Sequence, residues 1–291
     1  MRYAINNWVY ADEPLRETFS RLARFGYYGV ELKGEPELYS VDEIRSLSQE
    51  FDLAISSILG WCIWGIPGRD LSSPDDAERA AAFRYGQACI DFAAALDAPV
   101  VIVLPFPAGR TAPLGNPDTV AGWLQASNIE WENAVDSVRK AAVYAARQRV
   151  LLAVEPINRF ETYQIRTVEE GLRFLADVGE ENVKLNLDAF HMNIDEADPA
   201  GAIRKAGDQL AHMHVADSNR LPPGKGHTDF RAILAALHEV GFTGTMVLEP
   251  VPPGSDPGMA IRMPAYQQQK DVYAEESIRY LRQVEASLAP A

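Results

Sequence analysis

Short runs of apolar and β-branched residues alternate along this chain with longer segments in which apolar residues recur at helical spacing. The short runs have the length and composition of buried strands. They lie at residues 3–6, 29–33, 53–59, 99–105, 150–157, 183–190, 210–217 and 244–250. Strands that alternate with helices in this way are joined by crossover connections and run parallel to one another. The pattern therefore predicts eight strand–helix units in a row.

Helical segments are expected between these strands. They run from about residue 14 to 26, over 40–51, from 73 onward, over 128–148, from 167 onward, near 199–206, over 230–240 and over 271–288. Ser73 before Pro74 predicts an N-cap and a proline in the first turn of the third helix. No linker, repeat or low-complexity segment separates the units, so we expect a single-domain (β/α)8 TIM barrel over residues 1–291. An open doubly wound sheet is the alternative, but it rarely needs eight such even units.

The functional site of a (β/α)8 barrel lies at the carboxyl ends of its strands. The longest predicted connections all fall on that face, at residues 59–72, 106–125 and 251–270. Long loops there usually form lids, walls or subunit contacts. We expect the last of them, 251–270, to be a lid or a subunit contact. Apolar walls for a small ligand are expected from Trp8, Trp61, Trp64 and Phe106.

Each of the last four predicted strands ends in a polar residue, although the rest of the run is apolar. These residues are Glu155, Asp188, His214 and Glu249. A carboxylate in an apolar setting costs several kcal/mol unless a cation, a proton or a hydrogen-bonding partner compensates its charge. Any one of the four could be an ordinary ion pair or a hydrogen-bonded core residue. Because they recur on consecutive strands whose ends meet, we expect them to form one site.

Three carboxylates and one imidazole suit a hard or borderline divalent cation such as Mn²⁺, Mg²⁺ or Co²⁺. Strands five and eight are three apart around an eight-stranded ring, so Glu155 and Glu249 approach a central ligand from nearly opposite sides. Two carboxylates that flank one carbon can remove a proton from one face and return it to the other. The cation would polarise the neighbouring carbonyl group and stabilise an enediolate. The site therefore favours inversion at a carbon next to a carbonyl.

Two further residues have inward positions near this site. Glu31 ends the second predicted strand and could either reach the site or pair with the neighbouring Lys33. His212 has the same inward parity as His214 but lies one layer deeper. We expect His212 to support a ligand or to fill the barrel rather than to bind the cation.

Composition and charge exclude several other classes of function. The chain has 27 Lys and Arg against 41 Asp and Glu, which gives a formal charge of −14. We therefore expect no nucleic-acid partner, because phosphate backbones need a basic footprint, and no binding to an anionic membrane surface. An apolar run of ~18 residues, which a membrane span needs, does not occur. The two cysteines, Cys62 and Cys89, are too few for a disulfide framework, so we expect a cytoplasmic protein.

Four motifs resemble those of a known family. VEPINRFE, LDAFHMNID, HMHVADSNRLPPGKG and VLEP are similar to motifs of the ketose 3-epimerases (D-tagatose, D-allulose and L-ribulose 3-epimerases) of the xylose-isomerase-like barrel superfamily. The resemblance is specific after the fourth strand and mainly architectural before it. It implies that Glu155, Asp188, His214 and Glu249 bind one divalent cation per subunit, with Mn²⁺ expected first and Co²⁺ or Mg²⁺ as alternatives. It also implies that the two glutamates are the catalytic proton-transfer pair.

The same resemblance implies a set of substrate contacts. Glu161, His191 and Arg220 match the family residues that bind the first three oxygens of a monosaccharide ketose. Their side chains offer an acceptor, a neutral donor and acceptor, and a fixed fork of donors, which suits a hydroxyketone. From the residues alone, Glu161 and Arg220 could form a surface ion pair, and His191 could make a hydrogen bond at a helix entry. The resemblance further implies a homodimer or a homotetramer.

Taken together, the residues and the resemblance predict an isomerase of carbohydrate metabolism. We expect a metal-dependent epimerase that inverts C3 of a free ketose by proton abstraction and return through a metal-stabilised enediolate. An aldose–ketose or keto-acid sugar isomerase or epimerase and an inosose-type dehydratase remain alternatives on the same metal site. An apurinic endonuclease would need a basic groove and more histidines than the five present. A sugar-binding barrel without catalysis is a further alternative.

Overall fold

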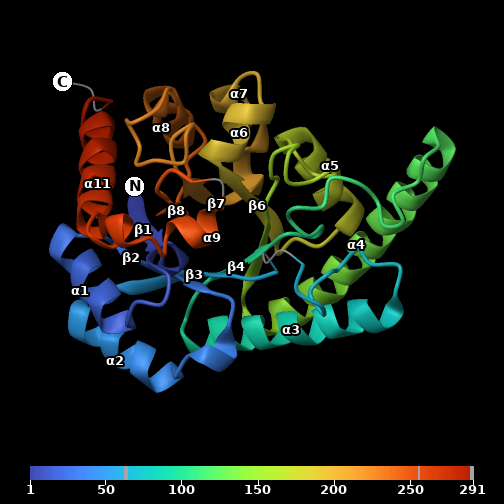
Figure 1. The fold of residues 1–291 in the computed structure, drawn as a ribbon, viewed down its shortest axis with the longest axis horizontal. Coiled ribbons are helices and arrows are strands. Elements are labelled where there is room, and N and C mark those ends of the chain that lie inside the picture. Colours follow the sequence, from blue (N-terminus) through green and yellow to red (C-terminus); the bar gives the residue numbers. More distant parts are fainter. Residues whose placement is uncertain (62–64, 255, 289–291) are drawn as a thin grey trace.

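The computed structural model describes residues 1–61, 65–254 and 256–288. Its centre is a closed barrel of eight parallel strands in sequence order, which Figure 1 shows in the colours of the sequence. The strands are β1 (Arg2–Asn6), β2 (Gly29–Lys33), β3 (Ala54–Leu59), β4 (Val100–Val103), β5 (Leu151–Val154), β6 (Val183–Asp188), β7 (Leu210–Val215) and β8 (Thr245–Leu248). The predicted (β/α)8 barrel is therefore confirmed.

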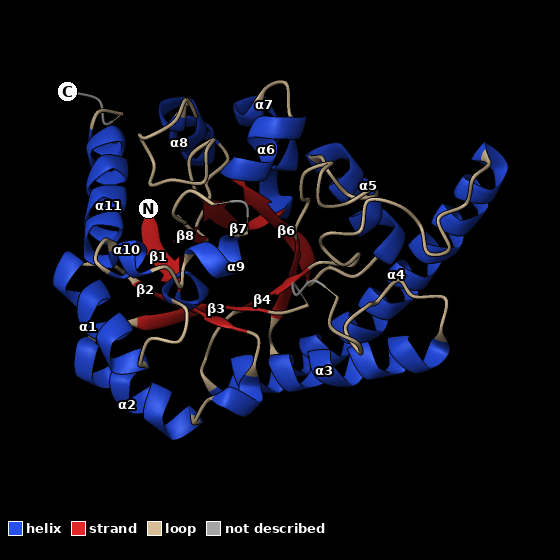
Figure 2. Cartoon of the chain, viewed as in Figure 1, coloured by secondary structure: helices blue, strands red, loops and turns tan. Residues whose placement is uncertain are grey.

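Helices form a layer outside the barrel, as Figure 2 shows. The longer ones are α1 (Leu15–Phe25), α2 (Val41–Phe51), α3 (Asp76–Ala95), α4 (Val120–Gln148), α5 (Val168–Val178), α6 (Ala189–Asp195), α7 (Pro199–Ala206), α8 (Phe230–Glu239) and α11 (Lys270–Ala286). Short turns of 3-10 helix occur at η1 (Asn7–Tyr10), η2 (Pro36–Leu38) and η3 (Gly207–Gln209). The last helix, α11, packs beside α1, so the outer layer closes where the first and last strands pair.

Two helix starts differ from the sequence-based prediction. Helix α4 begins at Val120 rather than near residue 128, because the hydroxyl of Thr119 caps it by accepting from the Gly122 amide. The added turns expose apolar side chains such as Leu124. The periodic spacing of buried apolar residues that predicts a helix is therefore missing from this part of the sequence. At α3 the cap is Asp75, not the predicted Ser73, whose hydroxyl instead accepts from the Asp75 amide.

Alternation along the strands separates side chains that pack against the helices from side chains that face the barrel interior, which is apolar at β4 and β5 and mostly polar elsewhere. On β7, Met213 and Val215 belong to the main apolar core, whereas His212 and His214 have the opposite parity and face the interior. The parity of β6 places Asp188 beside them. At the carboxyl ends of β6 and β7, the barrel interior is therefore lined by groups that can bind protons or cations.

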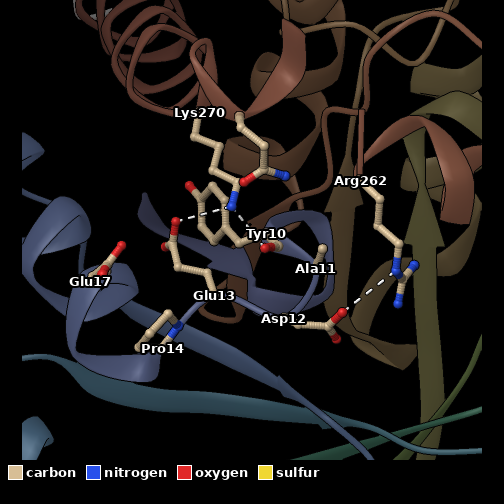
Figure 3. Close-up of a pocket in the computed structure, with 9 residues that line it drawn as sticks. Tyr10, Ala11, Asp12, Glu13, Pro14, Glu17, Arg262 and Lys270 are labelled. Atoms are coloured by element: carbon tan, nitrogen blue, oxygen red, sulfur yellow. Dashed lines mark hydrogen bonds and ion pairs between the residues drawn. The ribbon is translucent and has the colours of Figure 1, made fainter. Parts of the chain in front are cut away.

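The connection after β8 contains two short helices, α9 (Pro257–Ala260) and α10 (Pro264–Gln267). At its end the buried Lys270 donates to the carbonyl of Tyr10 at 2.9 Å and to the carboxylate of Glu13 at 3.1 Å. Figure 3 shows these contacts beside a pocket of about 350 Å³ between the connections that follow β1 and β8. The loop is thus fastened to the start of the chain. Its role as a lid or a subunit contact stays a prediction.

In the part of the chain that the structure describes, no helix has both the length and the apolar character needed to cross a membrane.

The ion pairs of Glu13 predict a dependence of stability on pH. Burial alone would raise the pKa of Glu13, but the hydrogen bonds and charges of Arg21, and then those of Lys270, hold it below its ordinary value. Glu13→Gln should destabilise the protein by about 3 kcal/mol at neutral pH, because the buried Lys270 loses its carboxylate partner and Arg21 keeps only Asp271. A carboxyl whose pKa is lower in the folded state stabilises above its unfolded pKa, and this stabilisation is lost as the pH falls through the folded pKa. Urea unfolding should show that the difference in free energy of unfolding between the wild type and Glu13→Gln is smaller at about pH 4 than at about pH 7.

The matched control is Glu50→Gln. The pair of Arg16 and Glu50 is far more exposed, with side chains 59 % and 45 % accessible, so its loss should change the free energy of unfolding much less than the loss of Glu13 does. If Glu13→Gln destabilised equally at both pH values, an ionised pair could not be the source of the effect.

Candidate metal centre

Four consecutive strands bring the predicted ligands to one end of the barrel interior. Asp188 is the last residue of β6, and His214 lies opposite it in the pairing of β6 with β7. Glu155 and Glu249 directly follow β5 and β8 and continue the inward parity of those strands. All four are buried, and the most exposed of them, Glu155, is 5 % accessible.

The four side chains contribute to two overlapping groups of possible ligand atoms. Asp188, His214 and Glu249 offer ligand atoms that all lie within 4.8 Å of one another. A second such group joins Glu155 to Asp188 and His191, so Asp188 belongs to both. The Nδ1 atom of His214 is 3.1 Å from Oε1 of Glu155 and 3.8 Å from Oε2 of Glu249. The structure therefore brings the four residues into two neighbouring groups that share Asp188.

Arg220 holds two of these carboxylates from the loop after β7. Its guanidinium donates to Oδ2 of Asp188 at 2.5 Å and to Oε2 of Glu249 at 3.2 Å, and it stacks over the ring of Phe190. The loop that carries it is fixed by Asp217, whose carboxylate accepts from the amides of Ser218, Gly224 and Thr228. Arg220 is thus placed in the site rather than in the surface ion pair that the residues alone allowed.

His191 and Glu161 lie on the other side of Asp188. One oxygen of Asp188 caps α6 by accepting from the Phe190 amide at 2.8 Å, which puts His191 in the first turn with its Nε2 atom 3.5 Å from Oδ2 of Asp188. The side-chain amide of Asn158 links His191 to Glu161, at 2.7 Å and 2.9 Å. The predicted substrate-contact residues therefore border the cluster of ligands.

The first strands contribute polar groups that the sequence reasoning missed or left open. Trp8, expected as an apolar wall, donates its indole N–H to Oε1 of Glu249 at 2.8 Å. Asn6 donates to the same oxygen at 3.1 Å and to Glu31 at 2.6 Å. Glu31 reaches the site and contacts His214 rather than pairing with Lys33. The inward-facing position of Asn6 at the end of β1 could have been predicted from the alternation of the strand. That position alone does not indicate which residues Asn6 contacts.

The other predicted walls have different positions. Trp61 is buried against α3, where its indole donates to the carbonyl of Ala82 at 3.0 Å and its ring fills the space above Gly86. Phe106 is buried among the rings of Trp131 and Phe174. These two side chains pack in the core and do not form an exposed wall. Trp64 lies outside the described residues.

The buried carboxylates have different pKa values for identifiable reasons. Burial raises the pKa of Glu249 to about 7, and the charges of His214 and Arg220 offset this only in part. Burial alone would also raise the pKa of Asp188, but Arg220 above all holds it below its ordinary value. Burial would lower the pKa of His214, yet the carboxylates of Glu249, Glu155 and Glu31 raise it well above its ordinary range.

This donor set fits a divalent cation. The buried carboxylates of the site outnumber Arg220 and His214, the groups whose positive charge is strongly favoured there. A divalent cation among carboxylates and one imidazole would balance the remaining charge, and oxygen-rich sets of this kind suit Mn²⁺, Mg²⁺ or Co²⁺. Glu155, Asp188, His214 and Glu249 are the residues that would hold it.

Comparisons with known proteins agree with this architecture. A family model described as xylose isomerase-like TIM barrel matches residues 19–284. A D-psicose 3-epimerase of Ruminiclostridium cellulolyticum is 45 % identical over 121 residues, which are 42 % of this chain and 41 % of that protein. The 3-dehydro-D-guloside 4-epimerase of Escherichia coli K12 is 27 % identical over 273 residues, 90 % of this chain and 97 % of that protein. A crystal structure of D-psicose 3-epimerase with D-tagatose from Clostridium cellulolyticum H10 has a TM-score of 0.82 at 27 % identity, covering 98 % of this chain and 99 % of that one.

The relatives differ in how much of them is matched. The sequence matches to three D-psicose 3-epimerases span about two fifths of the length of those proteins, namely 41 %, 39 % and 42 %. The 4-epimerase is matched over nearly its whole length at lower identity. The two kinds of relative are named for inversion at different carbons, so similarity alone does not select one reaction.

The ligand assignment predicts the effect of one substitution on metal binding. The purified protein, stripped with a chelator, should bind one Mn²⁺ per chain in isothermal titration calorimetry. Asp188→Asn should weaken this binding by more than about tenfold, since losing even a partner of a metal ligand costs 10–100-fold.

Glu161→Gln is the matched control, because Glu161 lies outside the clusters of possible ligand atoms in the described residues. It should leave the Mn²⁺ affinity within about threefold of the wild type, well inside the range that distinguishes a ligand. Equal losses in the two variants would contradict the proposed ligand set.

Proposed function

The chain belongs to the family of xylose isomerase-like TIM barrels, and we propose that it is a divalent-metal-dependent sugar epimerase that inverts C3 of a free ketose. The observation that carries the proposal is the convergence of two carboxylates on one imidazole. Glu155 and Glu249 come from β5 and β8 and approach Nδ1 of His214 at 3.1 Å and 3.8 Å. A carbon held between two such carboxylates can exchange its proton on both faces.

Glu155 and Glu249 are the proposed proton-transfer pair. One removes the C3 proton, which leaves an enediolate, and the other then delivers a proton to the opposite face of the same carbon. Burial raises the pKa of Glu249 to about 7 in the cluster without a cation, and the charge of a bound cation would lower it again. Its carboxylate is oriented by the indole of Trp8 on Oε1 and by Arg220 on Oε2.

The remaining residues hold the substrate and the cation. Asp188 and His214, together with the two glutamates, would bind a divalent cation, for which we expect Mn²⁺ first and Co²⁺ or Mg²⁺ as alternatives. Such a cation supplies Lewis-acid polarisation of the substrate carbonyl, which makes the neighbouring proton more acidic. Arg220, His191 and Glu161 would bind the hydroxyl and carbonyl oxygens around C1 to C3 of a monosaccharide.

A second candidate reaction is inversion at C4 of a 3-keto glycoside. The match to the 3-dehydro-D-guloside 4-epimerase over 97 % of that protein favours it. The chemistry is closely similar, because the proton that moves is again next to a carbonyl group. The two candidates therefore differ in which substrate carbon lies between Glu155 and Glu249.

Proton exchange in D₂O tests the proposed function. The Mn²⁺-loaded protein is incubated with fructose, tagatose or ribulose, the metal is removed, and the C3 position is followed by NMR. We expect deuterium at C3 together with the C3 epimer of the sugar. Glu155→Gln and Glu249→Gln, each at saturating Mn²⁺ with the metal content measured, should slow exchange by more than about 100-fold. Glu50→Gln removes an exposed carboxylate that pairs with Arg16, and this variant should exchange at the wild-type rate.

The outcome also separates the two candidates. A parallel incubation with a 3-keto glucoside should give little deuterium at C4 if the free ketose is the substrate. Exchange at C4 of the glycoside without exchange at C3 of any ketose would replace the first assignment by the second. Exchange at neither carbon, despite bound Mn²⁺, would leave the sugar isomerase and dehydratase reactions as those to assay next.

A further inference from the structure

Glu31 lies at the centre of a hydrogen-bond network beneath the metal centre. It comes from β2, is fully buried and points into the barrel. Its Oε1 atom is 2.6 Å from the side-chain nitrogen Nδ2 of Asn6 and 3.1 Å from Nε2 of His214. Its Oε2 atom is 2.5 Å from the hydroxyl of Ser57 and 3.2 Å from Nε2 of His212. Four potential donors therefore surround a single carboxylate.

The contact with His214 determines which ring nitrogen faces the metal centre. Nδ1 is the atom near Glu155 and Glu249, while Nε2 is directed at Glu31 on the opposite side of the ring. An uncharged imidazole carries a proton on one nitrogen and a lone pair on the other. Carboxylates can only accept, and Glu31 and Glu155 lie at the same distance of 3.1 Å from the two ring nitrogens, so each favours a proton on its own side. A cation that takes the carboxylate of Glu155 removes the acceptor at Nδ1, which leaves the proton on Nε2 with Glu31 and the lone pair on Nδ1.

A second cation between Glu31, His212 and His214 is the rival explanation, since their ligand atoms lie within 4.8 Å of one another. The neighbours of Glu31 argue against it. The amide nitrogen of Asn6 and the hydroxyl of Ser57 already point at its two oxygens. These groups donate protons to a carboxylate and would oppose a cation in the same space. The network is built to hold a carboxylate that accepts from all sides.

We propose that Glu31 is a positioning residue for the metal ligand His214. By accepting the Nε2 proton it fixes both the ring orientation and the proton position, so that the Nδ1 lone pair points to the cation among Glu155, Asp188 and Glu249. The inference rests on the proposed metal-dependent function, because it concerns how one ligand of that centre is presented. Hydrogen bonds of this kind to a ligating imidazole also make it a better donor to the metal.

Glu31→Leu and Glu31→Gln separate positioning from filling of space. Leucine has a similar volume but accepts no hydrogen bond, so the Nε2–H of His214 loses its partner. Glutamine keeps one oxygen, which can stay on the side of His214 while its amide group faces Ser57 and His212, whose side chains can each accept. A role limited to packing predicts similar behaviour from both variants. A positioning role predicts that glutamine rescues what leucine loses.

Metal affinity and the position of the histidine proton are the two measurements. Titration calorimetry with Mn²⁺ should give an affinity 10–100-fold weaker for Glu31→Leu, and a clearly smaller loss for Glu31→Gln. Ser57→Ala removes a donor from the far oxygen of Glu31 and should change the affinity by less than about threefold, below the range expected for a partner of a ligand. Circular dichroism of each variant establishes that it is folded.

The wild-type protein provides a test that needs no variant. In the ¹⁵N-labelled, Mg²⁺-loaded protein, NMR should show a proton on Nε2 of His214 and none on Nδ1. A proton on Nδ1, or an Mn²⁺ affinity of Glu31→Leu equal to that of the wild type, would overturn the role of Glu31 while leaving the proposed reaction intact. If the wild-type protein bound neither Mn²⁺ nor Mg²⁺, the metal centre and the role of Glu31 would fall together.

Discussion

Carboxylates buried at one end of the barrel must have their charge balanced, and the neighbouring residues meet this requirement in different ways. Glu31 is surrounded by potential donors and keeps a low pKa. Asp188 is paired with Arg220 and caps a helix. Glu249 also receives hydrogen bonds, but its burial outweighs them and its pKa is raised to about 7. The same cluster therefore contains carboxylates whose pKa is lowered by their partners and one whose pKa is raised by burial.

The barrel makes this arrangement rigid. Parallel strands with a fixed register set the inward parity of Asp188 and His214, which lie opposite one another between β6 and β7. The loops after the strands add further side chains to the site. Arg220 reaches the site because Asp217 fixes the backbone of the connection after β7, and Trp8 reaches Glu249 from the turn directly after β1. Groups that must be accurately placed thus come from strand ends or from short, internally bonded turns.

The sequence was most informative where one pattern governed both fold and chemistry. Polar residues that end apolar runs identified the strands and Asp188, His214 and their partners together. It was less informative where partners come from distant segments: inward parity could place Glu31 but could not choose between Lys33 and His214. It failed where packing gives no periodic signal. The first turns of α4 expose Val120 and Leu124, so their apolar residues follow no buried stripe, and their helical state depends on a local cap.

The pairing of β1 with β8 has a consequence for how the protein matures. Asn6 and Trp8, from the beginning of the chain, donate to Glu249, from near its end, and the amino terminus itself pairs with Glu285. Contacts between segments so far apart in the sequence carry a cost in loop-closure entropy and slow folding. The environment that tunes Glu249 therefore cannot form until β8 has paired with β1 and closed the ring.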